Sequence, residues 1–193
     1  MTLALAGAPA GVPADATNLA VRAAADFLAA AGLARAVRIF LTKSIPAAAG
    51  LGGGSSDAGA VLRALAASFP DALEEPALAR LALRLGADVP YFLAPCPARV
   101  GGIGERIQPL ADFAPLACLL VNPGVPLSTA AVFAAFDATP GEPPPAHAEP
   151  PVTSTFALSP SSFICWSILA VLGASSVMIT LSTPAALNLV SWG

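Results

Sequence analysis

A run of glycines and serines in the middle of the chain has the composition of a phosphate-binding loop. Within PAAAGLGGGSSD, residues 46–57, glycine occupies four of five consecutive positions: Gly50, Gly52, Gly53 and Gly54. Because glycine has no Cβ, the backbone can turn tightly there and approach a ligand closely. A helix predicted to begin at Ser55 or Ser56 would add free N–H groups, the positive end of its dipole and two hydroxyls. The segment predicts a phosphate cradle; a flexible hinge before a helix is the structural alternative.

Two better-known glycine loops do not fit these residues. A P-loop requires a lysine directly after its last glycine, but Ser55 follows Gly54. A dinucleotide fingerprint counted from Gly50 requires a third glycine where Ser55 stands. Any phosphate site here is therefore of another type.

Asp88 is the acid best placed for catalysis. It stands on a predicted turn between Gly86 and Pro90, where a carboxylate can face a cleft. Transfer of a phosphoryl group to an alcohol needs a carboxylate that orients or deprotonates the hydroxyl. A solvated or capping turn aspartate is the alternative interpretation.

Four other polar residues have an ordinary structural interpretation beside any functional one. Lys43 can be a solubilising charge at a strand end, Asn18 the first residue of a helix, and Glu105 a turn acid. His147 lies in a proline-rich stretch without neighbouring ligands, and Cys96, Cys118 and Cys165 form no CxxC pair. We therefore predict no metal site formed by side chains and no disulfide framework, and free thiols favour a reducing, cytoplasmic location.

The elements that must position these residues alternate between helix and strand. Predicted helices are Asn18–Ala31 with Thr17 as N-cap and Gly32 as stop, Ser55 or Ser56 to before Phe69, Glu75–Leu85 ending at Gly86, and a helix capped by Ser128 that reaches Phe136. Predicted strands are Ala36–Thr42, Val89–Leu93 and Leu116–Val121. The fold class is therefore α+β.

Charge divides the chain unequally. The sequence is 56% hydrophobic and 11% charged, and all of its charged residues lie between Asp15 and Glu149. A net charge of -3 provides no basic patch, so nucleic acid is not an expected partner. The start of the chain has no basic residues and only a short apolar run, so we expect no export signal.

The region after residue 138 differs from the rest. Residues 139–160 form a proline-rich linker, and residues 161–193 form an uncharged apolar tail, in our division of the chain. A reading-frame shift after about Pro150 would explain the loss of charge. Alternatively, Phe163–Leu181 is long enough for a membrane-spanning helix, although its serines and the lack of a flanking Lys or Arg oppose this.

Four segments together resemble the GHMP kinases, in particular the branch that acts on a cytidyl-methylerythritol substrate. They are PAAAGLGGGSSDA, NLAVRAA at Asn18–Ala24, LGADVPYFL at Leu85–Leu93 and GIGERIQPL at Gly102–Leu110. The resemblance implies the α+β fold of the GHMP-kinase N-terminal domain (ribosomal protein S5 domain 2-like) over residues 1–138. It also implies phosphorylation of the 2-hydroxyl of 4-diphosphocytidyl-2-C-methyl-D-erythritol, with ATP and Mg²⁺, in non-mevalonate isoprenoid biosynthesis.

The same resemblance implies roles for individual residues. Asp88 would be the catalytic base, and Asn18 and Lys43 would bind the adenine. The ATP phosphates would lie against the loop residues Pro46, Ala47, Ala48, Ala49, Gly50, Leu51, Gly52, Gly53, Gly54, Ser55 and Ser56.

The chain departs from the family pattern at both ends. We find no A-K-I-N-L or D-G-Y-H segment before Asn18, and no N-D-L-E or G-S-G-A segment after Asp137. Because the first two supply a lysine beside the catalytic acid and the cytidyl clamp in the family, the 193-residue chain is expected to be an incomplete domain with negligible kinase activity. The alternative functions are a non-catalytic nucleotide-binding module or a membrane-tethered remnant.

Overall fold

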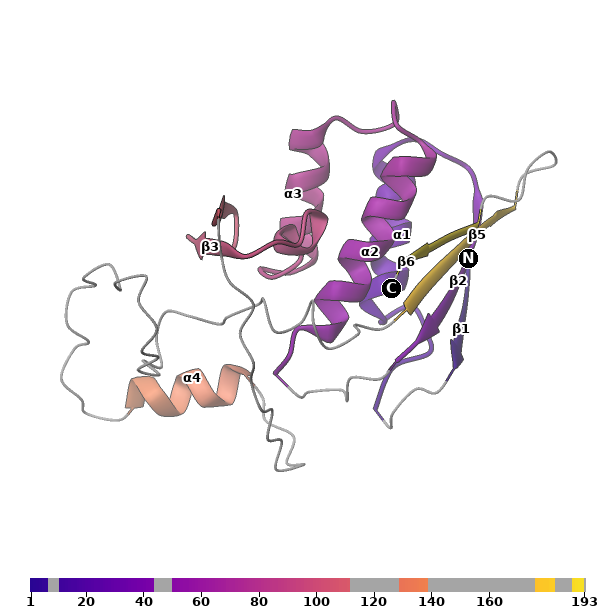
Figure 1. Cartoon of the computed structure of the whole chain (residues 1–193). Coiled ribbons are helices and arrows are strands. Elements are labelled where there is room, and N and C mark those ends of the chain that lie inside the picture. The colour runs from indigo at the N-terminus through magenta and orange to yellow at the C-terminus, as the bar shows by residue number, and fades with distance from the viewer. Residues whose placement is uncertain (7–10, 44–49, 112–128, 139–175, 183–188, 193) are drawn as a thin grey trace.

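A four-stranded sheet forms one layer of the protein. The computed structural model describes residues 1–6, 11–43, 50–111, 129–138, 176–182 and 189–192. The strands follow the order β1-β2-β5-β6, formed by Thr2–Ala6, Ala36–Thr42, Ser176–Ser182 and Leu189–Trp192 (Figure 1). β1 is parallel to β2, whereas the two later strands are antiparallel to their neighbours.

β2 has a neighbour on each side and faces the core with alternate residues. Leu3 pairs with Ile39 on one side, and Ile179 pairs with Ile39 on the other. Val37, Ile39 and Leu41 are buried, while the residues between them point to the other face of the sheet. This two-residue period is typical of a sheet covered on one face.

Three helices lie on that side of the sheet. They are α1 (Leu19–Ala30), α2 (Gly53–Ser68) and α3 (Glu75–Leu85) (Figure 1). α1 and α2 pack against the sheet, and α3 packs on these two helices. Small residues such as Ala20, Ala23 and Ala24 let α1 lie close against α2, and larger side chains fill the space toward the sheet. The largest fully buried side chains are Phe27, Ile39, Leu41, Leu62, Leu65, Leu81, Val37, Val61 and Val89.

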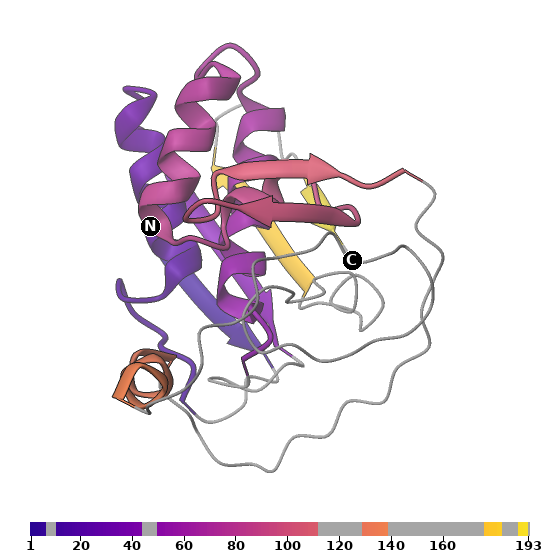
Figure 2. The same cartoon turned by 90° about the vertical axis from the view of Figure 1, so that its left-hand side faces the viewer.

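A short 3-10 helix and a hairpin follow α3 along the chain. The 3-10 helix η1 spans Pro90–Leu93, and the antiparallel strands β3 (Ala98–Gly101) and β4 (Arg106–Pro109) follow it. The hairpin crosses beside α3, on the side of the helices away from the sheet (Figure 2). A last helix, α4, spans Thr129–Ala138.

The regular elements around the glycine loop are close to their predicted bounds. The strand Ala36–Thr42 and the helix Glu75–Leu85 are confirmed without change. α1 ends before Gly32, which adopts a φ of 63° as a C-terminal stop does. α2 ends at Ser68 as predicted, but begins two residues earlier than Ser55 because glycines form its first turn.

Two local predictions are wrong. Val89–Leu93 is not a strand: Pro90 begins the 3-10 helix, since proline lacks an N–H but fits the first turn of a helix. Thr17 is not the N-cap of α1. Its N–H and hydroxyl both donate to the Asp15 carboxylate, and Asn18 caps the helix instead. The predicted strand Leu116–Val121 and the predicted cap Ser128 lie outside the described residues.

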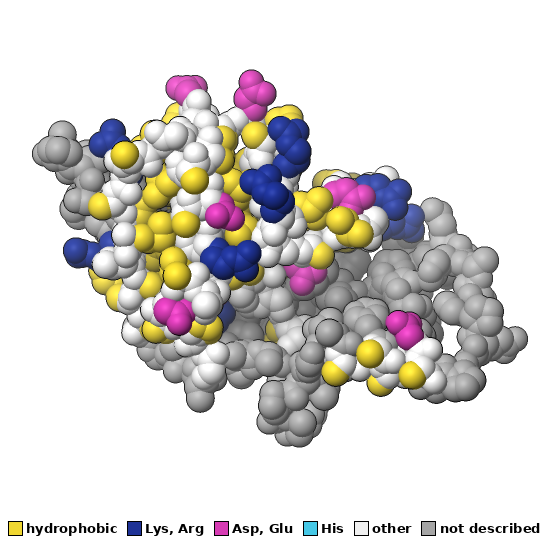
Figure 3. Space-filling view, turned by 180° about the vertical axis from the view of Figure 1, so that it is seen from behind, with side chains coloured by type: hydrophobic (Ala, Val, Ile, Leu, Met, Phe, Trp, Pro, Cys, Tyr) yellow, Lys and Arg dark blue, Asp and Glu magenta, His cyan; other side chains and the backbone are white. Residues whose placement is uncertain are grey.

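Two strands of the sheet come from the uncharged tail, where the sequence pattern predicted none. β5 includes the last six residues of the run Phe163–Leu181, so that part of the run is a strand and not a membrane helix. In the part of the chain that the structure describes, no helix is both long enough and apolar enough to cross a membrane. Seen from behind the view of Figure 1, the described surface has basic side chains among acidic and apolar ones (Figure 3).

Candidate nucleotide site

The glycine loop leads directly into α2, as predicted. Gly50 and Gly52 have φ angles of 72° and 64°, in the left-handed region that favours glycine. Gly52 is the N-cap, and the Ser56 N–H donates to its carbonyl oxygen to form the first helical hydrogen bond. The N–H groups that precede that of Ser56 therefore have no carbonyl acceptor within the helix. The helix is 16 residues long, and its dipole is positive at this end.

The start of α2 has two properties that suit an anion. No side-chain hydrogen bond caps it, whereas the start of α1 is capped by Asn18. A Cβ added at Gly50 or Gly54 would also meet no heavy atom of the described residues within 4 Å, so these residues leave space open at both positions. An uncapped helix start with free space before it is the arrangement with which proteins bind phosphate groups.

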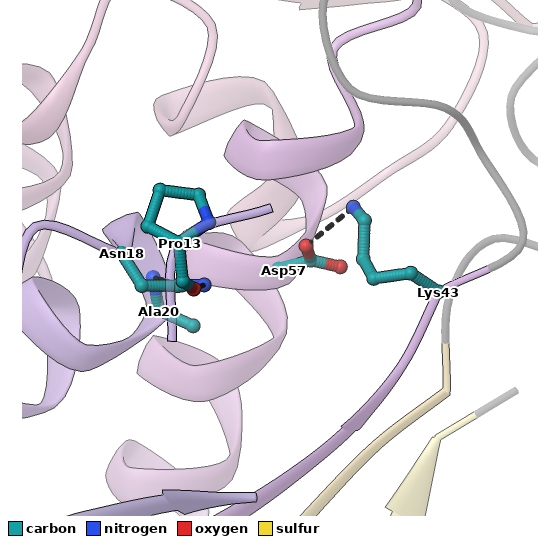
Figure 4. Close-up of polar contacts among 5 residues, drawn as sticks. All are labelled: Pro13, Asn18, Ala20, Lys43 and Asp57. Carbon is teal, nitrogen blue, oxygen red and sulfur yellow. Dashed lines mark hydrogen bonds and ion pairs between the residues drawn. The ribbon is translucent and has the colours of Figure 1, made fainter. Parts of the chain in front are cut away.

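Lys43 and Asp57 form a buried ion pair beside this loop. Lys43 follows the last residue of β2, and its Nζ lies 2.6 Å from Oδ2 of Asp57, the fifth residue of α2 (Figure 4). The two side chains are 5% and 4% exposed. Asp57 was not predicted to be a site residue; its place directly after the glycines and serines was the available signal.

Both polar atoms of the Asn18 side chain form a hydrogen bond within the protein. Its Oδ1 accepts a hydrogen bond from the Ala20 N–H at 3.0 Å, and its Nδ2 donates to the Pro13 carbonyl at 2.8 Å (Figure 4). The residue is 6% exposed. The structure therefore places Asn18 at the start of α1 as an N-cap, which was the structural alternative; its role toward adenine stays a prediction.

Asp88 lies on the turn between α3 and η1. The turn is closed by the Val89 N–H, which donates to the Gly86 carbonyl. Partial burial raises the pKa of the Asp88 carboxyl above its usual value, since removal from water disfavours the charged form. A carboxylate with a raised pKa holds a proton more strongly, as a general base must.

Contacts of η1 hold the Asp88 turn beside the glycine loop. Tyr91 and Phe92 form a small apolar cluster to which Leu51 of the loop contributes. Phe92 also lies directly against Gly59 of α2, where an added Cβ would come within 2.9 Å of the Phe92 carbonyl oxygen. The turn that carries Asp88 and the loop that starts α2 are therefore packed on the same side of α2.

The turn between β3 and β4 packs against Ala87, the residue before Asp88. Gly104, with a φ of 113°, is buried against the carbonyl group of Ala87, where any Cβ would overlap it. Glu105 accepts a hydrogen bond from the Ile103 N–H at 2.7 Å, and this bond and that of its own N–H lower the pKa of its carboxyl. Glu105 is thus a turn acid, which was the structural alternative for it.

The structure describes only some of the residues that the sequence assigned to the site. Pro46, Ala47, Ala48 and Ala49 lie outside the described residues, as does His147. Among the described residues, no group of three or more His, Cys, Asp or Glu side chains could hold a metal ion. The loop and the Asp88 turn are brought together, whereas Asn18 and Lys43 use their polar groups on protein partners.

Comparison with known families agrees with this geometry. Residues 18–94 match the model of the GHMP kinases N terminal domain, a segment that includes α1, β2, α2, α3 and η1. The resemblance to GHMP kinases and the mixed α and β fold class are thereby confirmed over these residues.

Several similar curated proteins bear the name 4-diphosphocytidyl-2-C-methyl-D-erythritol kinase. The relative from Mesorhizobium japonicum is 49% identical over 140 residues, which are 72% of this chain and 47% of that protein. The relative from Symbiobacterium thermophilum is 50% identical over 62% of this chain and 43% of its own length. A crystal structure of 4-(cytidine 5'-diphospho)-2C-methyl-D-erythritol kinase is 51% identical, with a TM-score of 0.46, over 56% of this chain and 38% of that one.

The aligned segment is a smaller fraction of each relative than of this chain. The chain spans about half or less of the length of the curated relatives that it matches. The segment matched by the family model, residues 18–94, contains the glycine loop, the Asp88 turn and the helices that carry them.

Proposed function

We propose that this chain provides the ATP-binding part of a kinase that phosphorylates the 2-hydroxyl of 4-diphosphocytidyl-2-C-methyl-D-erythritol in isoprenoid biosynthesis. The observation that carries the proposal is the uncapped start of α2, with open space at Gly50 and Gly54, in a segment that matches a kinase domain. The choice of acceptor is supported by the similar proteins, since the relatives compared above are named as kinases of this compound.

The loop and helix bind the phosphates of ATP. Backbone N–H groups of residues 52–55 donate to the phosphate oxygens, and the dipole of α2 favours their negative charge. Ser55 and Ser56, both partly exposed, add hydroxyl groups at the same end. Mg²⁺ would be carried mainly by the phosphates, as is usual for this ion, with help from such hydroxyls.

Asp88 accepts the proton of the acceptor hydroxyl. Its raised pKa suits a general base, and its turn is held beside the loop through Tyr91 and Phe92. In phosphoryl transfer the protein contributes mostly position and charge, so placement of this carboxylate matters more than its strength. Of the residues that the resemblance assigns to the nucleotide, Asn18 and Pro46–Ala49 complete the proposed site, and Lys43 belongs to it through its ion pair with Asp57.

A cytoplasmic location is part of the proposal. Cys96, the cysteine that the structure describes, is a free thiol, which suits a reducing compartment. ATP and small-molecule acceptors are also available there.

Calorimetric titration of the 193-residue chain with MgATP tests the binding step. We expect a dissociation constant of about 1 μM to 1 mM, the range in which enzymes commonly hold their substrates. Asp88→Asn is the matched control, because it should leave the affinity for MgATP nearly unchanged. The absence of any binding at millimolar MgATP would remove the proposal.

A kinase assay with the cytidyl substrate tests the catalytic step separately. The sequence-based expectation is binding without measurable turnover, because the family segments that hold the acceptor were not found. Product formation that is lost in Asp88→Asn would show instead that the chain contains the whole catalytic site. Binding with no product agrees with an ATP-binding part on its own, and equally with the alternative function, a non-catalytic nucleotide-binding module.

A further inference from the structure

We propose that Lys43 is a positioning residue that acts on the glycine loop through Asp57, and not by direct contact with the nucleotide. The inference rests on the proposed function, because it concerns how the loop is prepared for phosphate. It differs from the role that the family resemblance implies, in which Lys43 binds the adenine. The observation behind it is the buried Nζ–Oδ2 contact of 2.6 Å.

The pair joins the two elements that flank the loop. Lys43 comes directly after β2, and Asp57 lies one turn into α2. A short contact between them fixes the start of α2 relative to the end of the sheet, and the N–H groups of the loop with it. Because both side chains are almost fully buried, water cannot replace either partner without a large loss.

The pair also controls the charge near the phosphates. Asp57 places a carboxylate close to the helix start that is proposed to bind a polyanion. Without a cation beside it, this carboxylate would repel the phosphates, and the repulsion would be strong in a site of low dielectric. Lys43 neutralises it, so that the N–H groups and the helix dipole dominate the local field.

The burial of Lys43 favours this indirect role. Its side chain is 5% exposed, and its ammonium already donates to a carboxylate. To contact a nucleotide directly it would have to leave Asp57 and expose a buried carboxylate without its charge partner. An interaction gained with the nucleotide would have to exceed that cost.

Four variants separate the two roles by their affinity for MgATP. Lys43→Met should raise the Kd at least about tenfold, which corresponds to 1.4 kcal/mol. The double variant Lys43→Met with Asp57→Asn should return the Kd to within about threefold of the unmodified chain, because it removes both charges of the pair. Arg38→Met is the matched control: it removes one positive charge from an exposed position on the same strand and should change the Kd less than about twofold. Asp57→Asn alone leaves the buried cation without this carboxylate and removes the contact that fixes the loop, so it should also raise the Kd. An ammonium that contacted the nucleotide directly would instead bind as well without Asp57.

A double variant as weak as Lys43→Met would overturn the proposal, since it would mean that the ammonium itself contacts the nucleotide. A second measurement does not depend on binding. Lys43 is the only lysine of the chain, so [15N]lysine labelling gives one side-chain ammonium signal. We expect a slowly exchanging signal that is lost in Asp57→Asn and changes little when MgATP is added.

Hydrogen exchange of the loop separates failure of this inference from failure of the proposed function. In the nucleotide-free protein, the amides of residues 56 to 60 should exchange at least about tenfold faster in Lys43→Met, and the double variant should recover most of the protection. If the unmodified chain binds no nucleotide, the proposed function fails while this comparison still tests the pair. Unchanged protection in Lys43→Met would refute the positioning role.

Discussion

Single residues of the candidate site are held by interactions within the protein before any ligand arrives. Asn18 is occupied as an N-cap, Lys43 as one half of a buried ion pair, and Glu105 as a turn acid. The groups left for a ligand are mainly the backbone N–H groups at the start of α2. Recognition by fixed backbone groups suits phosphate, whose charge is spread over several oxygens.

The partly buried carboxyl of Asp88 should lower stability at neutral pH. Its pKa is raised in the folded state by desolvation, so the folded chain holds this proton more tightly than the unfolded chain. The associated stability is present below the unfolded pKa of about 4 and is lost as the pH rises through the folded pKa. Asp88→Asn should therefore have a higher Tm than the unmodified chain at pH 7, and the difference should shrink toward pH 4.

Thermal unfolding measured between pH 4 and pH 8 checks this prediction. Asp26→Asn, which removes an exposed carboxylate from α1, is the control and should shift Tm little at any pH in the range. An Asp88→Asn variant less stable than the unmodified chain at pH 7 would contradict it, and would mean that the carboxylate has a favourable partner.

Gly104→Ala should be strongly destabilising. Its φ of 113° is unfavourable for alanine, and the new Cβ would lie 2.7 Å from the Ala87 carbonyl carbon. Strain and overlap together should cost about 3 kcal/mol or more of unfolding free energy. Gly32→Ala is the matched control, because Gly32 also has a positive φ but nothing lies within 4 Å; it should cost only about 1–2 kcal/mol. Equal losses in urea denaturation would show that overlap with Ala87 contributes nothing.

At the scale of elements, two of the three glycines of α2 lie in different surroundings. Gly59 permits close packing, since a Cβ there would lie 2.9 Å from the Phe92 carbonyl oxygen of η1. Gly54 meets nothing, so protein packing alone gives no reason for a glycine at that position. A ligand that approaches the first turn of α2 would provide one.

This difference predicts opposite effects of the same substitution. Gly59→Ala should lose about 1–3 kcal/mol because η1 must move away from α2. Gly54→Ala should gain up to about 1 kcal/mol from helix propensity, and yet weaken MgATP binding because its methyl group enters the open space. Denaturant titration and calorimetry on the two variants measure both quantities. If Gly54→Ala bound MgATP as well as the unmodified chain, the phosphates would not lie against this turn.

The elements with local signals could be predicted from sequence, and those that depend on distant partners could not. α1 and α3 have apolar periodicity and a terminal glycine, so their ends were found within about a residue. Val89–Leu93 has the composition of a strand, but Pro90 and the packing of Phe92 on Gly59 make it a 3-10 helix. β1 was missed because TLALA becomes a strand only through its pairing with β2.

The candidate site divides in the same way. The glycine spacing predicts the loop and the start of a helix, because those properties belong to a few consecutive residues. The Lys43–Asp57 pair joins residues 14 positions apart and depends on how α2 packs on the sheet. The contact between Gly104 and Ala87 likewise exists only after the hairpin folds back on the Asp88 turn. Sequence spacing carries no direct signal for either contact.

At the scale of the whole molecule, the uncharged tail is part of the sheet that carries the loop. β5 pairs with β2 along the full length of both strands, from Ala36 with Ser182 to Thr42 with Ser176. β2 ends next to Lys43, so the tail stabilises the strand from which the glycine loop departs. A β2 without this neighbour would be an edge strand with unpaired N–H and C=O groups.

Hydrogen exchange of β2 therefore tests whether the tail is seated as described. Along a strand, successive N–H groups point to opposite neighbours, so a central strand protects all of them and an edge strand only every second one. We expect slow exchange for every amide from Arg38 to Leu41, resolved by NMR, because β1 and β5 flank this stretch on both sides. Alternate fast and slow exchange would show that β5 is absent from the sheet in solution, and β2 would then depend on β1 and the helices alone to hold the base of the loop.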